Sequence, residues 1–199
     1  EVQPFSEKDN GGDIVETSFL FQGLIAAKEY FQTVGSGEAL QLVADIDKLW
    51  EEMEWSHYVR NGKLMWHWSP DYDFQMNLPI VGWNEGMIAY VLAASSPTFP
   101  IEKEVYTGGF QNGGSIVCGG TAYNYILPLG EMSSKGGPLF FAHYSFLGLD
   151  PRGLSDGICR DYFEQNKNHT LINMAYCIDN PKNFEGYSES FWGLTASDC

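Results

Sequence analysis

The stretch ALQLVADIDKLWEEM, residues 39–53, decides the class of fold, because its apolar side chains recur at intervals of three and four residues. That spacing lines them up along one face of an α-helix. Comparable patterns predict helices over 13–31, 85–94, 100–110, 140–147 and 161–178, and a further helix that starts at Ser188. Because each apolar stripe must pack against another element, the sequence predicts an all-α fold.

The segments between these helices are irregular. Residues 64–74 alternate in polarity around Ser69-Pro70-Asp71, which predicts a β-hairpin that turns there. Residues 111–137 are rich in glycine, and a smaller hairpin is expected at 123–129. Long loops inside compact domains usually serve a function. We therefore expect the chemistry to lie in these connections.

The composition narrows the class of ligand. The formal charge of −15 repels phosphate backbones and argues against a nucleic acid as partner. Aromatic residues reach 15%, and their flat rings can stack on sugars or simply fill a core. No apolar run in the sequence is long enough to span a bilayer. A carbohydrate fits such a surface, although acidic residues also serve solubility.

The cysteines and the common motifs give no sign of a cofactor. Cys118, Cys159, Cys177 and Cys199 lack the spacing of a zinc site, so we expect buried free thiols, with a single disulfide as the alternative. The sequence has no nucleotide-binding glycine loop, no GxSxG motif and no HExxH motif. No metal and no cofactor are expected.

Three acids gather where the first helix should begin. Asp13 and Glu16 share one helical face, and Asp9 lies just upstream beside two glycines. A helix N-terminus keeps nearby carboxylates ionised, as a base or an acceptor of sugar hydroxyls requires. The alternative is that these acids only stabilise the helix dipole.

Glu85 follows Gly82-Trp83-Asn84 and precedes an apolar helical face. A carboxyl group packed against Trp83 would be desolvated and would hold its proton, as a general acid requires. An ordinary acidic residue in a first helical turn, capped by Asn84, is the alternative.

Aromatic and imidazole side chains complete the set of candidate binding residues. Trp66, Trp68 and Tyr72 lie in the expected hairpin, where alternation puts His67 on the opposite face from the two indoles. His143 and Tyr144 carry polar tips within an apolar run. All of these rings, and that of Trp83, can face a sugar, and each can equally belong to the core.

Six strings occur in the order of a known family along nearly the whole chain: DNGGDIVET at 9–17, WHWSP at 66–70, GWNE at 82–85, LAASSPT at 92–98, GPLFFAHYSFLGLDPR at 137–152 and WGLTASD at 192–198. They resemble the bacterial "putative glucoamylase" group, a glycoamylase-like family related to endo-β-1,2-glucanases. The resemblance implies an (α/α)6 toroid with short β-hairpins in its loops and an acidic, periplasmic or secreted glycosidase.

The resemblance also implies a reaction. It suggests hydrolysis of β-1,2-glucan or its oligosaccharides with inversion, Glu85 as catalytic acid, and base or substrate contacts from Asp9, Asp13 and Glu16. A glucan-binding protein without activity on the same scaffold, or an inactive fragment, is the alternative.

The chain is short for such a toroid. Twelve helices of ordinary length need roughly 250 residues or more, whereas residues 1–199 form a single domain segment that begins with Glu1. We therefore expect the central part of the domain, with further segments in the same polypeptide or in a separate chain.

Overall fold

The computed structural model describes residues 6–196, and their contacts divide into two compact units. The first unit comprises residues 6–81 together with Gly86–Phe110. The second comprises Gly82–Glu85 and residues 111–196. Each unit has its own core, and each is described by itself.

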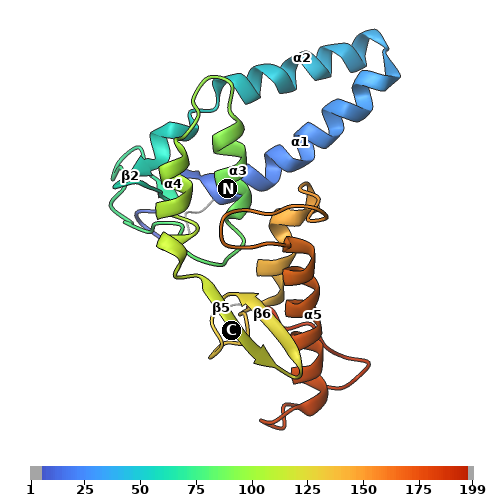
Figure 1. Cartoon of the computed structure of the whole chain (residues 1–199). Coiled ribbons are helices and arrows are strands. Elements are labelled where there is room, and N and C mark those ends of the chain that lie inside the picture. Colours follow the sequence, from blue (N-terminus) through green and yellow to red (C-terminus); the bar gives the residue numbers. More distant parts are fainter. Residues whose placement is uncertain (1–5, 197–199) are drawn as a thin grey trace. The chain divides into compact units, whose positions relative to one another are not determined.

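Two long helices form the frame of the first unit. α1 (Ile14–Val34) ends at Gly35, whose φ of 66° lies in the left-handed region that glycine adopts without strain. α2 (Gly37–Glu52) runs back beside α1 (Figure 1), and an ion pair of 2.5 Å joins Lys28 to Asp47 across the two. The helices predicted over 13–31 and 39–53 are confirmed.

Aromatic rings pack together between α1, α2 and the segment that follows α2. The ring of Phe21 lies 5.4 Å from that of Trp50 and 5.7 Å from that of Trp55, a residue of the short 3-10 helix η1 (Trp55–Tyr58). Trp55 is fully buried. Burial of aromatic surface of this size is a main source of folding free energy.

α3 (Met87–Ser95) and α4 (Lys103–Gly108) complete the helices of the first unit. The helix predicted over 85–94 begins later than expected, at Met87, and its N-cap is Gly86 without a side-chain hydrogen bond. The expected cap at Asn84 is therefore wrong, and Glu85 precedes the helix. The helix predicted over 100–110 is shorter than expected.

The strands of the first unit correct one prediction. β2 (Val59–Arg60) pairs with β3 (Lys63–Leu64), whereas β4 (His67–Trp68) pairs with the distant β1 (Gly12–Asp13). The hairpin predicted over 64–74 is thus wrong. Within that range, Ser69 and Asp73 form an isolated antiparallel bridge across a tight turn.

Glycine makes the pairing of β1 with β4 possible. A Cβ atom on Gly11 would lie 2.2 Å from the carbonyl oxygen of Trp68, and one on Gly12 would lie 2.2 Å from the Tyr58 hydroxyl. No larger residue fits this close approach. Local alternation in 64–74 could not reveal a partner strand more than fifty residues away.

The second unit consists of a hairpin packed on a helix. β5 (Val117–Ala122) and β6 (Tyr125–Leu129) turn at Tyr123 and Asn124, both with positive φ. Gln165 of α5 (Tyr162–Asp179) accepts the Leu129 N–H at 2.8 Å, which ties the helix to the hairpin. The helix expected over 161–178 is confirmed, and the hairpin expected at 123–129 is present but longer, because its first strand begins at Val117.

Two other predictions for this unit need correction. Residues 140–147 form two 3-10 turns, η3 (Leu139–Ala142) and η4 (Tyr144–Leu147), instead of one α-helix. The segment after Ser188 contains no helix up to residue 196. Cys118, Cys159 and Cys177 are free thiols, the latter two buried, while Cys199 lies outside the described residues.

Both units leave apolar side chains in contact with water. Leu40 and Leu49 of α2 are 50% and 52% exposed, and Phe163 and Ile178 of α5 are 47% and 49% exposed. The apolar stripes of these helices are therefore only partly covered by the residues described. No helix within residues 6–196 is long and apolar enough to cross a membrane.

Candidate active site

Asp13 is fixed in place by three hydrogen-bond donors. Its Oδ1 accepts the N–H groups of Val15 and Glu16 at 2.8 and 3.0 Å, which makes it the N-cap of α1. Its Oδ2 accepts the indole Nε1–H of Trp66 at 3.1 Å. The negative charge of Asp13 adds to burial in raising the pKa of Tyr58.

His67 joins Asp13 to Asp9. The β1–β4 register places His67 opposite Asp13, and its Nδ1 lies 3.2 Å from Asp9 Oδ1 and 3.6 Å from Asp13 Oδ2. This nitrogen is shielded from solvent, and neither contact has hydrogen-bond geometry. The imidazole also stacks on the Trp66 indole, with ring centroids 6.1 Å apart. Two carboxylates, one imidazole and one indole thus form a compact group, here called the acidic cluster.

Glu16 belongs to the same turn but points to solvent. It lies in the first turn of α1, where its backbone N–H reaches Asp13, and it is exposed. Its carboxylate is therefore available to a ligand. The expected proximity of Asp9, Asp13 and Glu16 is present in the first unit.

The two other aromatic candidates of the first unit lie around the 69–73 turn. Trp68 is half-buried and meets the ring of His57 edge-on at 5.7 Å. Tyr72 is half-buried, and its hydroxyl donates to Glu7 Oε1 at 2.6 Å, a contact that raises the pKa of the phenol. Neither ring is fully buried, so both stay candidates for sugar contact.

In the second unit, buried contacts of the neighbouring Trp83 hold the segment that carries Glu85. Trp83 is buried, stacks on Tyr162 at 6.4 Å and donates its indole N–H to His169 Nδ1 at 3.4 Å. His169 Nε2 in turn lies 3.0 Å from the carbonyl oxygen of Gly137. Because Nδ1 accepts and Nε2 donates, the buried imidazole is neutral, and burial lowers its pKa.

Glu85 itself is anchored through its main chain. The Ser145 hydroxyl donates to the Glu85 carbonyl oxygen at 2.6 Å, and Oε2 of the Glu85 carboxyl group is shielded from solvent. Trp83 supports this segment from the core and presents no exposed ring.

His143 and Tyr144 lie where η3 meets η4. His143 is exposed, and its Nε2 lies 3.0 Å from the Thr170 hydroxyl oxygen. Tyr144 is 45% exposed and packs against Phe140 at 5.2 Å. Both residues are exposed, so both stay candidates for ligand contact.

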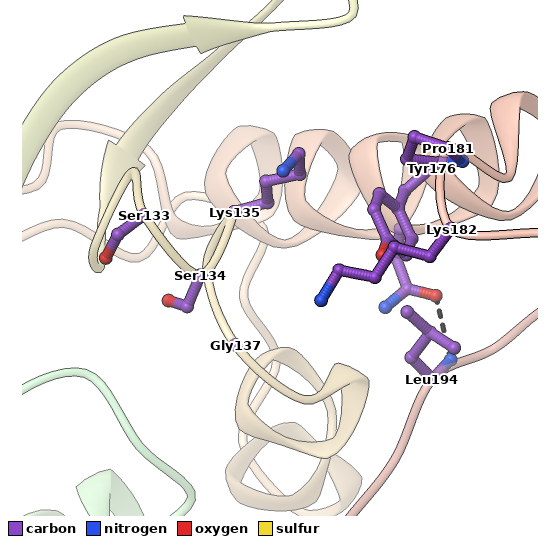
Figure 2. A pocket seen from close by; sticks show the side chains of 9 residues that line it. Ser133, Ser134, Lys135, Gly137, Tyr176, Pro181, Lys182 and Leu194 are labelled. Atoms are coloured by element: carbon purple, nitrogen blue, oxygen red, sulfur yellow. Dashed lines mark hydrogen bonds between the residues drawn. The ribbon is translucent and has the colours of Figure 1, made fainter.

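A separate cavity of about 410 Å3 opens in the second unit between the 133–137 loop and the C-terminal end of α5. Figure 2 shows Lys135 and Lys182 reaching it from opposite sides, and the Lys135 ammonium lies 5.1 Å from the Tyr176 ring centre. Ammonium and hydroxyl donors of this kind can bind hydroxyl or anionic groups. The cavity contains none of the residues singled out from the sequence.

The sequence missed two residues of these sites. His67 was placed on the face opposite the indoles, because strand alternation was applied to a hairpin that does not form. His169 was taken as part of an amphipathic helix. Its role becomes clear only from the structure, where its imidazole accepts the hydrogen bond of the Trp83 indole. Within residues 6–196, no three His, Cys, Asp or Glu side chains are grouped to hold a metal ion.

Comparison with known proteins places these features in context. Residues 77–199 match the family model described as "Glycoamylase: Putative glucoamylase". The chain is 44% identical, over 98% of its length, to a Parabacteroides distasonis protein named exo beta-1,2-glucooligosaccharide sophorohydrolase (non-reducing end).

Two solved structures share the fold over the whole chain. One is an endo-beta-1,2-glucanase from Chitinophaga pinensis in complex with sophorotriose and glucose, at 50% identity and a TM-score of 0.93. The other is a putative glucoamylase from Bacteroides uniformis, at 50% identity and a TM-score of 0.94. The chain spans 48% of each of these structures and 29% of the Parabacteroides protein.

Proposed function

The chain belongs to the "putative glucoamylase" family, and from this premise we propose that it forms part of a glycoside hydrolase that cleaves β-1,2-linked glucan or its oligosaccharides. The observation that carries the proposal is the agreement between two independent facts. Relatives named for β-1,2-glucan hydrolysis match the chain at 44% and 50% identity. The chain also carries Glu85, with one carboxyl oxygen shielded from solvent, and a separate cluster of carboxyl groups at the start of α1; acid–base hydrolysis of a glycoside needs two such carboxyl groups.

Each carboxyl group has a role in this reaction. Glu85 donates a proton to the leaving oxygen, and Oε2 of its carboxyl group is shielded from solvent. Asp9 or Glu16 assists the attacking water. Asp13 is less suited to accept a proton, because three donors already occupy its oxygens. Inversion requires the acid and the base to lie about 6.5–9.5 Å apart, with the water between them.

The aromatic and imidazole side chains would bind the glucan. Trp66, Trp68 and Tyr72 in the first unit, and His143 and Tyr144 in the second, are all at least partly exposed. Ring faces can stack on pyranose C–H groups, and the hydroxyl and imidazole tips can bind sugar hydroxyls. Trp83 serves the reaction by supporting Glu85.

Release of reducing sugar from β-1,2-glucan tests the proposal. A polypeptide of the relatives' length that contains this chain should release sophoro-oligosaccharides, and Glu85→Gln should lower kcat by about 10²–10⁴-fold, as expected for loss of a general acid. Asp45→Asn is the matched control, because Asp45 is an exposed acid on α2 whose carboxylate accepts a hydrogen bond from the neighbouring Gln41. Binding of the glucan without release would instead identify a non-catalytic glucan-binding protein.

We also propose that the two units belong to an (α/α)6 toroid completed by other polypeptide. The exposed apolar residues of α2 and α5 support this, as does the 48% share of the Chitinophaga structure that the chain spans. Soluble monomers seldom expose contiguous apolar faces. Binding of a hydrophobic dye should fall when the chain is studied within a polypeptide of the relatives' length. We propose a periplasmic or secreted location for the protein, which fits hydrolysis of a glucan. Cell fractionation would test this location.

A further inference from the structure

The acidic cluster restrains its two carboxylates by different means. Asp13 is directed by the backbone of α1 and by the Trp66 indole, so its orientation follows from the fold itself. Asp9 lies in the turn before β1, where its own N–H donates to the Ser6 carbonyl. Its carboxylate Oδ1 lies 3.2 Å from His67 Nδ1. Contact with this imidazole therefore restrains the direction in which Asp9 faces a ligand.

The placement of His67 suits this task. Pairing of β4 with β1 fixes its backbone opposite Asp13, and stacking on Trp66 fixes its ring plane. Its side chain is 12% exposed, so the contact with Asp9 is largely sheltered from water. Electrostatic contacts are stronger in such surroundings than at an open surface.

We propose that His67 is a positioning residue for the reaction: through Nδ1 it holds the Asp9 carboxylate at the angle required to contact water or substrate. The inference rests on the proposed glycosidase function and deepens it. His67 acts through Asp9 and takes no proton from the reacting groups. A displacement of about 1 Å in such a group can lower a rate by about 100-fold, which sets the size of the effect.

Two amide substitutions separate positioning from direct action. In His67→Asn the side-chain amide nitrogen replaces Nδ1, and in His67→Gln it replaces Nε2. We expect His67→Asn to keep kcat within about threefold of the wild type. His67→Gln and His67→Ala should lower kcat by about 10–100-fold, with KM changed less than kcat. All three should be compared at equal folded fraction, measured by thermal unfolding.

The outcomes are distinct. Wild-type activity in His67→Ala, or an equal loss in the folded Asn and Gln variants, would overturn the positioning role while the proposed function stands. Rescue by Gln and not by Asn would show that Nε2 acts on the substrate, which also overturns it. A wild-type chain without activity on β-1,2-glucan, when present in a polypeptide of the relatives' length, would overturn the proposed function and this inference with it.

Discussion

The acidic cluster and the segment that carries Glu85 hold carboxyl groups in opposite ways. In the cluster, N–H donors bind the carboxylate of Asp13 directly, and an imidazole lies against that of Asp9. At Glu85, the protein binds the main chain through Ser145 and supports the neighbouring Trp83 through His169. The proposed function assigns the acid to Glu85 and the base to Asp9 or Glu16 beside the donor-bound Asp13.

The largest expected effect on stability concerns the support behind Glu85. His169→Ala should lower the free energy of unfolding by about 3 kcal/mol, because the Trp83 indole and the Gly137 carbonyl both lose a buried partner. Chemical denaturation would measure it. His143→Ala, at an exposed imidazole of the same unit, should cost at most about 0.5 kcal/mol. Equal costs would show that the Trp83–His169 contact contributes little.

A smaller effect is expected in the acidic cluster. Asp13→Ala should cost about 2 kcal/mol, because it removes both cap hydrogen bonds of α1 and the partner of the Trp66 indole. Ser36→Ala, which removes the single cap bond of α2 at 3.3 Å, should cost about 1 kcal/mol or less. Paired thermal melts give the difference, and a larger loss in Ser36→Ala would contradict the description of Asp13 as the stronger cap.

The smallest expected effect is a dependence of stability on pH. Burial lowers the pKa of His169 below its ordinary value of 6.5, so the unfolded chain binds this proton more readily than the folded one. The contribution of neutral His169 is complete above pH 6.5 and is lost as the pH falls toward the folded-state pKa. His169→Gln should therefore show a flatter stability profile below pH 6.5. An unchanged slope would mean that this imidazole does not titrate with unfolding.

Periodic features were readable in the sequence, whereas long-range pairings were not. Residues 39–53 and 161–178 predicted α2 and α5 because a helix face repeats every three or four residues. A hairpin was also expected at 123–129, a range that covers the turn and β6 but not β5. Pairing of β1 with β4 carries no local signal, because it depends on the absence of side chains at Gly11 and Gly12.

The candidate site followed the same rule. Asp9, Asp13 and Glu16 were expected to lie close together because they are within eight residues of one another, at the start of one helix. His67 and His169 were not, since each acts on a residue distant in sequence. Burial of Trp83 also could not be predicted from the residues around it, because an indole ring can pack in a core or stack on a sugar equally well.

A double-mutant cycle tests most directly the claim that the two regions serve one reaction. The measurement is kcat on β-1,2-glucooligosaccharides for the wild type, Glu85→Gln, Asp9→Asn and the combination of the two. Residues that act as a unit give strongly non-additive losses. We expect the double variant to be little slower than Glu85→Gln alone. A double variant whose loss equals the product of the two single losses would show that Glu85 and Asp9 act independently, and would contradict the account.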